Sequence, residues 1–480
     1  MRVLFVSAEV APFAKVGGLA DVAGSLPKAL HELGVDIRVM MPKYMAVTKV
    51  ARELRRVVHT CAVPMPGWTS GCALDEAVLP GSEVPIYFVE HNGYFWREEV
   101  YGPPGGAYPD NLERLSFLCR AALAVLGPLG WSPDLFHLND WHTAPLAILA
   151  RQRGLRQATV FTAHNLGAGY QGVFAAEQAW VLGIDASLPW VTKFFSGGEI
   201  NLARAGLACA DMISVVSPTY ARELRDPAVG AGVDDLIRER GEDVWGILNG
   251  LDYDFWNPAT DRFLDPADGY ATFSAGDLSG KAACKAALQV EMGLPREPDV
   301  PLVGMVTRLD AQKGLDLVSA ALPELSGLQM VVLGTGAREY EEFFAGQAQQ
   351  RPEVAVALKF DERLAHRIYA GADIFLMPSR FEPCGLGQMI ALRYGTIPVV
   401  RATGGLADTV HEDGPQPNGF VFTDYTPQAL RGALGRAVAA YHRKDEWAKL
   451  VANAMTCDFS WGASARRYLE LYQEAIARKG

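Results

Sequence analysis

The chain has 480 residues and a formal net charge of −11, and 49% of its residues are hydrophobic. This length favours two α/β domains, and the apolar content is sufficient for large cores. An acidic chain is not built for general attraction to nucleic acid or anionic lipid, so we expect neither partner. Any anionic ligand must therefore be held by a local cluster of donors.

The first half of the chain alternates short apolar runs with helical patterns. Met1–Val6 resembles the start of a signal peptide, but Glu9 and Lys15 interrupt it, so we predict a first strand there. No stretch approaches the length of a membrane span. Alternation of this kind predicts a doubly wound parallel sheet. The expected strands are Val3–Val6, Ile37–Met41, Ile86–Val89, Leu135–Leu138, Thr159–Thr162 and Met212–Val215, with helices at Leu112–Leu126 and Ala144–Arg153.

The second half repeats this organisation after a weak stretch, Asp254–Arg296, which is rich in Asp, Pro, Gly and Ala and has no clear strand. We place the boundary near Val244–Asn249, where we expect a new strand to open the second domain. The predicted domains are residues 1–245 and 246–456, followed by a C-terminal helix in 457–480 that packs back on the first domain. The expected second-domain strands are Leu302–Val306, Met330–Leu333, Val354–Leu358, Ile374–Met377 and Ile397–Val400.

The seven cysteines are scattered along the chain, their number is odd, and no two of them form a Cys-x-x-Cys pair. This usage disfavours a disulfide framework or a zinc site and favours a reducing compartment, which we take to be the cytoplasm.

A five-residue segment, Gly-Gly-Leu-Ala-Asp, occurs at Gly17–Asp21 and again at Gly404–Asp408. Each copy follows an apolar strand and precedes a helical pattern. Glycines at such a turn let backbone amides approach a phosphate, and the helix start adds partial positive charge. A tight turn that needs positive φ is the alternative explanation. With one copy in each predicted sheet, the pair predicts a ligand held between two domains, with Lys15 as an additional cation.

Four loops that follow predicted strands carry further polar candidates. Arg308 and Lys313 lie in Arg-Leu-Asp-Ala-Gln-Lys-Gly after Leu302–Val306, and both side chains suit phosphate oxygens. Glu382 follows Ile374–Met377 and suits sugar hydroxyls or a cation-like anomeric carbon; a salt bridge to Arg380 is the simpler alternative. His142 and His164 follow two first-domain strands, where each is either a structural hydrogen-bonding residue or a contact to sugar.

The sequence offers little sign of a metal or of a bound cofactor. Asp252-Tyr253-Asp254 spells a DxD triplet without the surrounding pattern of a metal site, so we expect no essential metal. The cations Lys15, Arg308 and Lys313 replace one in neutralising a leaving diphosphate. No P-loop or nucleophile elbow is present, and Gly334-Thr335-Gly336 lacks the third glycine of a dinucleotide fingerprint.

Together these motifs resemble those of the bacterial glycogen synthases and plant starch synthases, in the same order and from end to end. Lys15–Leu19 resembles the Lys-x-Gly-Gly-Leu signature of that family. The other matching segments are Asn139–His142, Thr162–Asn165, Asn249–Asp252, Arg308–Gly314, Pro378–Leu386 and Thr403–Asp408.

The resemblance implies a GT-B type fold, in which two Rossmann-like doubly wound domains face a deep cleft. It also implies transfer of glucose from ADP-glucose to the non-reducing end of an α-1,4-glucan such as glycogen, with retention of configuration and without an essential metal. The choice of ADP-glucose over UDP-glucose rests on the resemblance alone.

By position, the resemblance also assigns site residues. Arg308 and Lys313 match the residues that hold the donor phosphates, Glu382 the carboxylate that binds donor glucose, and His164 the histidine near the reacting carbon. Phe360 matches an aromatic that stacks on the base. The remaining donor-side residues are Lys15, Gly17, Gly18, Cys384, Gly385, Leu386, Thr403, Gly404 and Gly405, and the acceptor-side residues are Asp21, Asp140 and Tyr94, with Phe95 beside it.

One position departs from the pattern of many retaining relatives, which carry a second Glu eight residues after the first. Here that position is Ile390, a relaxation that the bacterial glycogen synthases share. With no second carboxylate placed as a nucleophile, we expect no covalent intermediate. The acceptor hydroxyl would attack from the departing face, and the leaving phosphate would take its proton.

Three other functions fit the same architecture. A sugar-nucleotide epimerase would convert ADP-glucose to an isomer without any glucan. A glucan phosphorylase would carry pyridoxal phosphate, which visible absorption would reveal. A non-catalytic glucan or nucleotide sensor would bind ligand without releasing nucleoside diphosphate. The cations clustered with Glu382 suit a developing charge pair and argue against a sensor.

Overall fold

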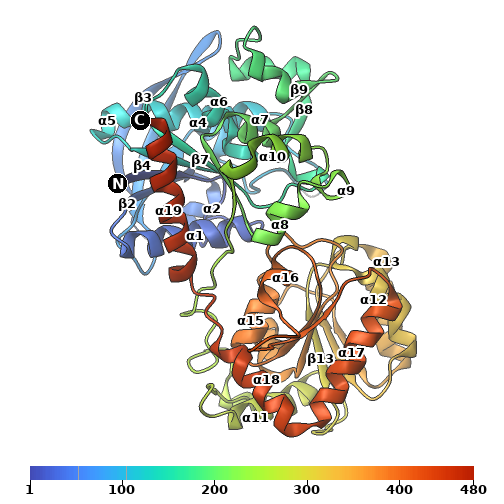
Figure 1. Ribbon diagram of the computed structural model, residues 1–480. Coiled ribbons are helices and arrows are strands. Elements are labelled where there is room, and N and C mark those ends of the chain that lie inside the picture. Colours follow the sequence, from blue (N-terminus) through green and yellow to red (C-terminus); the bar gives the residue numbers. More distant parts are fainter. Residues whose placement is uncertain (52, 104) are drawn as a thin grey trace. The chain divides into compact units, whose positions relative to one another are not determined.

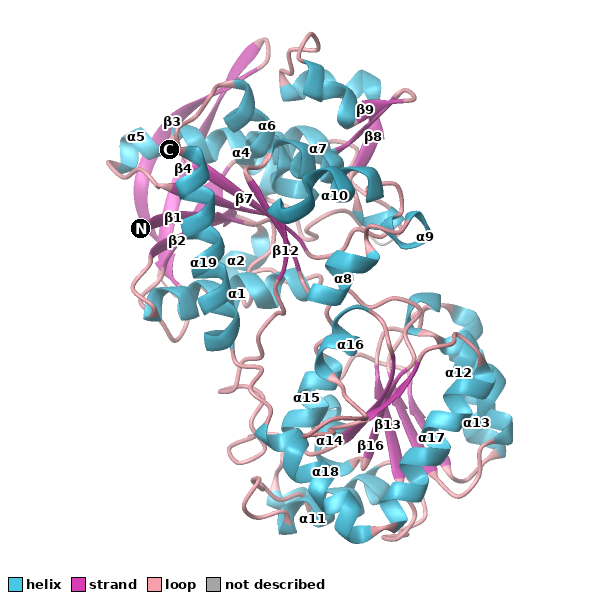
Figure 2. Ribbon diagram, viewed as in Figure 1, coloured by secondary structure: helices cyan, strands magenta, loops and turns pink. Residues whose placement is uncertain are grey.

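The computed structural model describes residues 1–480 except Arg52 and Pro104. These residues form two compact units, Met1–Gly250 with Trp461–Gly480, and Leu251–Ser460. In each unit, parallel strands form a central sheet with helices packed against it (Figures 1 and 2). The expectation of two doubly wound α/β sheets is confirmed.

The first unit is built on a nine-stranded sheet, counted over the described residues. Its strands, in spatial order, are β12 (Val244–Gly246), β11 (Met212–Val215), β7 (Ala158–Ala163), β6 (Leu135–Asn139), β1 (Arg2–Val6), β2 (Asp36–Pro42), β5 (Pro85–Glu90), β4 (Trp68–Val78) and β3 (Arg55–Met65). The pairs from β12 to β5 are parallel, whereas β5, β4 and β3 pair antiparallel. The long hairpin of β3 and β4 was not among the strands predicted from the sequence.

Helices cover this sheet in two groups. Helix α1 (Gly18–Glu32) packs with α19 (Trp461–Lys479), and α6 (Ala144–Gln152) packs with α4 (Asn111–Ala124) and α7 (Leu202–Cys209). Buried apolar positions of α19, among them Leu471 and Ala475, recur at helical spacing and explain why this terminal segment docks. Figure 1 shows α19, in red, beside α1.

The strand expected to open the second domain instead closes the first sheet. Val244 of β12 pairs with Ile213 of β11 in parallel register. The short apolar run therefore completes an edge of the existing sheet, and the second unit begins at Leu251.

The second unit is built on a six-stranded parallel sheet, again counted over the described residues. Its spatial order is β15 (Val354–Ala357), β14 (Gln329–Leu333), β13 (Leu302–Val306), β16 (Ile374–Met377), β17 (Ile397–Arg401) and β18 (Phe420–Phe422). The order reverses direction after β15, which places a topological switch point between β13 and β16. Figure 2 shows helices on both sides of this sheet.

The helices of the second unit fall into two packed groups. One group is α12 (Leu315–Ala321), α13 (Arg338–Gln350) and α17 (Pro427–His442), and the other is α11 (Ser279–Glu291), α14 (Glu362–Gly371), α15 (Gly387–Arg393) and α18 (Lys444–Thr456). Helix α11 was not predicted from the sequence, because two of its buried positions are Lys285 and Gln289, which break the apolar periodicity.

All seven cysteines are free. Across the described residues, no helix combines the length and apolar character that crossing a bilayer requires.

Candidate active site

The loop between β1 and α1 is held by a buried carboxylate that was not among the residues predicted from the sequence. Glu9 Oε2 accepts hydrogen bonds from the amides of Val16 at 2.6 Å and Gly17 at 3.0 Å. Its other oxygen accepts from the hydroxyl of Tyr101 at 2.6 Å. Glu9 is 3% exposed, so these bonds offset its desolvation and fix the backbone that precedes α1. The signal in the sequence was an acid inside an apolar run.

The side chains at the start of α1 are exposed. Lys15 Nζ lies 2.7 Å from Asp21 Oδ1, and the two side chains are 54% and 37% exposed. Ion pairs this exposed contribute about 0–1 kcal/mol, so Lys15 can exchange Asp21 for a phosphate at little cost. A Cβ on Gly17 or Gly18 would meet nothing within 4 Å. Gly17 has φ of −140°, so a turn that needs positive φ does not explain this glycine.

Two histidines and an aspartate follow β6 and β7. Asp140 Oδ1 accepts the amide of His164 at 2.7 Å, and His142 stacks on Tyr101 with ring centroids 4.7 Å apart. Asp140 adopts φ of +55°, a costly conformation for a residue with a Cβ. Burial raises the pKa of Asp140 to about 7, although the His164 amide opposes the shift. Burial lowers the pKa of both His142 and His164 to about 3.

The hydrogen bonds of His164 fix its tautomer. Asn139 donates through Nδ2 to the carbonyl of Val6 at 3.0 Å, so its Oδ1 is an acceptor. His164 Nε2 lies 3.1 Å from that oxygen and must carry the proton. The other ring nitrogen, Nδ1, is therefore an acceptor, and it is buried with no hydrogen-bond partner among the described residues. This atom suits a hydroxyl donor supplied by a ligand.

The two aromatic residues assigned to the acceptor side, Tyr94 and Phe95, differ in burial. Tyr94 is half-buried, stacks on His91 at 4.2 Å and donates its hydroxyl to Glu113. Phe95 is fully buried, so it belongs to the core and has no surface to offer a sugar.

In the second unit, the loops after β13 and β16 meet through an ion pair. Lys313 Nζ lies 2.7 Å from Glu382 Oε2, and the side chains are only 17% and 8% exposed. Ser379 donates to the same oxygen at 2.9 Å. Arg380, whose salt bridge to Glu382 was the alternative explanation, instead reaches Asp316 at 3.0 Å. Arg308, 60% exposed, approaches Asp310 at 3.6 Å. The pair is thus made by Lys313, across the switch point of the sheet.

The second glycine motif packs against this same loop. A Cβ on Gly404 would collide with the carbonyl oxygen of Glu382, and one on Gly405 with that of Cys384. Gly404 also has φ of +45°. The amide of Gly405 donates to the carbonyl of Glu382 at 3.1 Å. This corrects the expectation that both glycine amides face a diphosphate, because the Gly405 amide is already engaged within the chain. Thr403, which precedes α16 (Gly404–Thr409), is buried.

The segment from Cys384 to Leu386 connects Glu382 to α15. Gln388 Nε2 donates to the carbonyls of Cys384 at 3.1 Å and Gly385 at 3.0 Å, contacts that the sequence alone did not predict. Gly385 has φ of +75°, which favours glycine. Cys384 is buried, and Leu386 is half-buried against the core. The backbone of this loop is therefore rigid.

Three further residues from the sequence lie apart from these contacts. Phe360, after β15, is 91% exposed. Ile390 is 5% exposed within α15, so the position of the second carboxylate is part of the core. The carboxylate of Asp252 accepts the amides of Asp254 at 2.9 Å and Phe255 at 3.2 Å and so caps a turn.

Comparison with known proteins decides the family. The profile of the starch synthase catalytic domain matches residues 2–239, and that of group 1 glycosyl transferases matches residues 293–453. A glycogen synthase of Anaeromyxobacter sp. (strain Fw109-5) is 49% identical over 99% of this chain and all of its own length. That of Thermotoga maritima is 44% identical over the full length of both.

The chain belongs to the glycogen synthase family. It is therefore a glycosyltransferase of GT-B type, with two Rossmann-like domains. A solved structure agrees: the catalytic domain of Arabidopsis thaliana starch synthase IV, bound to ADP and acarbose, has a TM-score of 0.88 and 38% identity over 99% of each chain. Sucrose-phosphate synthase from Thermosynechococcus elongatus is 19% identical to this chain over 99% of each, and its TM-score of 0.60 shows a similar fold.

Proposed function

We propose that this glycogen synthase family member transfers glucose from ADP-glucose to the non-reducing end of an α-1,4-glucan, with retention of configuration. The observation that carries the proposal is full-length similarity, at 49% identity, to a curated glycogen synthase. The starch synthase IV structure, described as bound to ADP and acarbose, supports an adenine nucleotide and a glucan-like acceptor as ligands. The seven free cysteines support a reducing cytoplasm.

In the second unit, we assign the donor phosphates to Arg308 and Lys313. Arg308 is exposed enough to turn towards a ligand, and Lys313 is already oriented by Glu382. Bound diphosphate would share the Lys313 ammonium with Glu382, and the two cations would stabilise the negative charge that develops as it leaves. We assign the glucose hydroxyls to Glu382, whose remaining carboxylate lone pairs can accept their hydrogen bonds. Phe360 offers an exposed ring for the base.

In the first unit, we assign sugar recognition to His164 and Asp140. With its pKa near 3, His164 is neutral at pH 7, so it acts as a hydrogen-bond acceptor through Nδ1 and not as a cation. Lys15 and the open start of α1 offer a second contact to donor phosphate. No metal is required by these roles.

The experiment supplies ADP-glucose and UDP-glucose separately, each with and without glycogen, and measures the released nucleoside diphosphate and the product. We expect ADP release that depends on glycogen, and new α-linked glucose that amylase removes. An isomer of the donor formed without glycogen would indicate an epimerase, and binding without diphosphate release would indicate a sensor. Either result would reject the proposal.

A further inference from the structure

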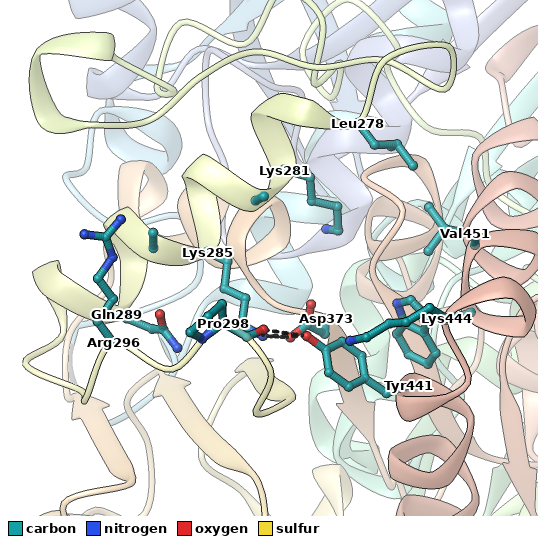
Figure 3. Close-up of a pocket in the computed structure, with 14 residues that line it drawn as sticks. Leu278, Lys281, Lys285, Gln289, Arg296, Pro298, Asp373, Tyr441, Lys444 and Val451 are labelled. Atoms are coloured by element: carbon teal, nitrogen blue, oxygen red, sulfur yellow. Dashed lines mark hydrogen bonds and ion pairs between the residues drawn. The ribbon is translucent and has the colours of Figure 1, made fainter.

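A cavity of about 590 Å³ lies at the amino edge of the second sheet. Its lining includes Pro298, which precedes β13, and Asp373, which directly precedes β16. Lys313 and Glu382 follow the opposite, carboxyl ends of these same two strands. Because the strands are parallel, the length of the sheet separates the cavity from the second-unit part of the candidate active site. Figure 3 shows side chains from several elements converging on the cavity.

The cavity lining carries an excess of positive charge in an acidic chain. Four basic side chains contribute to it, Lys281, Lys285, Arg296 and Lys444, against one carboxylate, Asp373. Lys285 pairs with Asp373 at 2.7 Å, and Lys444 comes only within 3.9 Å of Asp299. Among the described residues, neither Lys281 nor Arg296 has a carboxylate within ion-pair distance. The field inside the cavity therefore favours an anion.

The buried cation Lys281 and the exposed cations Arg296 and Lys444 have different roles. Lys281 Nζ donates to the carbonyls of Ala370 at 3.1 Å and Tyr394 at 3.0 Å and to Thr396 Oγ1 at 2.8 Å. All three donors of its ammonium are thus used, and it is a fixed source of charge. Burial lowers the pKa of Lys281 to about 8, so a nearby anion would stabilise its charged form. Arg296 is exposed and the Lys444 side chain is 59% exposed, so both can donate to a ligand.

The rest of the lining is largely apolar and aromatic. Leu278 and Val451 contribute aliphatic surface, and Tyr441 and Trp447 contribute rings whose centroids lie 5.3 Å apart at an interplanar angle of 77°. Lys444 Nζ lies 4.1 Å from the centroid of the Tyr441 ring. An apolar wall with a few charged groups is typical of sites for small organic ligands, and the volume lies within their usual range, about 300–1,000 Å³.

We propose that this cavity binds a small organic anion with a planar apolar body, such as an aromatic sulfonate or carboxylate. The body packs on Trp447, Val451 and the aliphatic stems of Lys281 and Lys285 in α11, and the positive charges of Arg296 and Lys444 attract the acidic group. A glucan does not suit this cavity, because a glucan carries no charge to pair with the basic side chains. The proposal does not rest on the proposed function, since it concerns the opposite edge of the sheet.

The test uses anilinonaphthalene sulfonate as the probe, and phenylnaphthylamine, the same ring system without the sulfonate, as its neutral counterpart. Fluorescence titration of the full chain should give one saturable site for the sulfonate, with at least tenfold weaker binding of the neutral compound. The double variant Arg296→Glu/Lys444→Glu should weaken sulfonate binding at least tenfold and leave the neutral compound unaffected. Ala282→Phe should abolish both signals, because Ala282 lines the cavity and is itself exposed.

Lys449→Glu is the matched control, because Lys449 is exposed on the same helix α18 and does not line the cavity. It should bind the sulfonate within twofold of the wild type. The proposal is overturned if the double variant binds as tightly as Lys449→Glu or if Ala282→Phe retains the site.

Discussion

The ammonium of Lys313 and the carboxylate of Glu382 form a buried pair at 2.7 Å between the loops that follow β13 and β16. Each group makes the burial of the other tolerable, and the pair joins two loops 69 residues apart in the chain. Lys313 is therefore both a proposed phosphate ligand and a structural partner. Removing it should have two separable effects, one on turnover and one on stability.

Lys313→Ala should lower kcat with ADP-glucose by about 10²–10³, the usual cost of losing one preorganised donor to developing charge. It should also destabilise the second unit by roughly 3 kcal/mol, since Glu382 remains buried without its cation. Adding Glu382→Gln should restore most of the stability and none of the turnover. Thermal unfolding and steady-state kinetics measure the two effects.

Arg380→Ala is the control for this pair, because Arg380 is exposed and bonded to Asp316. Its effect on stability should stay within about 1 kcal/mol. Near-normal turnover of Lys313→Ala would contradict the assigned role, and failure of Glu382→Gln to restore stability would contradict the buried-pair interpretation.

The two Gly-Gly motifs should respond oppositely to alanine. Gly18 is the first residue of α1, and a Cβ there would meet nothing within 4 Å. Gly18→Ala should therefore stabilise the chain by up to about 1 kcal/mol. It should nevertheless raise KM for the donor, because the methyl occupies space at the proposed phosphate contact. Gly405→Ala collides with backbone and should lower the unfolding temperature by several degrees. A destabilised Gly18→Ala, or a stable Gly405→Ala, would refute this distinction.

Most strands of the two large sheets were predictable from the sequence, because parallel strands buried on both faces are continuous apolar runs, as in Leu302–Val306. The hairpin of β3 and β4 was not, since in β3 exposed and buried residues are mixed and no clear apolar run marks the strand. Helix α11 was missed because Lys285 and Gln289 occupy buried positions and are satisfied by long-range partners, Asp373 and Gln329. Such partners cannot be identified from local pattern.

The candidate residues themselves were predictable from motifs, whereas the residues that orient them by hydrogen bonds were not. Glu9, Ser379 and Gln388 orient the selected residues through contacts that only the fold creates. The incorrect alternative, a pair between Arg380 and Glu382, followed from proximity in sequence. Lys313 makes that contact because β13 and β16 are neighbours in the sheet.

Phe360 should act on donor affinity alone. Its ring is 91% exposed, so Phe360→Ala should change stability by less than about 0.5 kcal/mol. If the ring stacks on adenine, its loss should raise KM for ADP-glucose by about tenfold, which corresponds to the lower part of the 1–3 kcal/mol typical for base stacking. Phe360→Tyr keeps the ring and should keep KM. An unchanged KM in Phe360→Ala would remove this residue from the site.

The contribution of the Asp140 carboxyl to the stability of the first unit should decrease as pH rises. Burial raises its pKa to about 7, well above the ordinary value of 3.8. Between pH 4 and 7 the unfolded carboxyl loses its proton while the folded one retains it, so the unfolding free energy falls over this window. His142 and His164, with pKa lowered to about 3, act in the opposite sense, losing stability as pH falls below about 6.5. The comparison must therefore be made against a variant that changes Asp140 alone.

Asp140→Asn keeps an oxygen for the His164 amide and removes the titration. Relative to this variant, the wild type should lose about 1–4 kcal/mol of stability between pH 4 and pH 8, the range set by about 1.4 kcal/mol for each unit of pKa shift and by the partial exposure of the carboxyl. Urea unfolding of both proteins across this range measures the difference. Parallel curves would show that the pKa of Asp140 is the same in the folded and unfolded chains, and they would contradict the raised pKa on which this prediction depends.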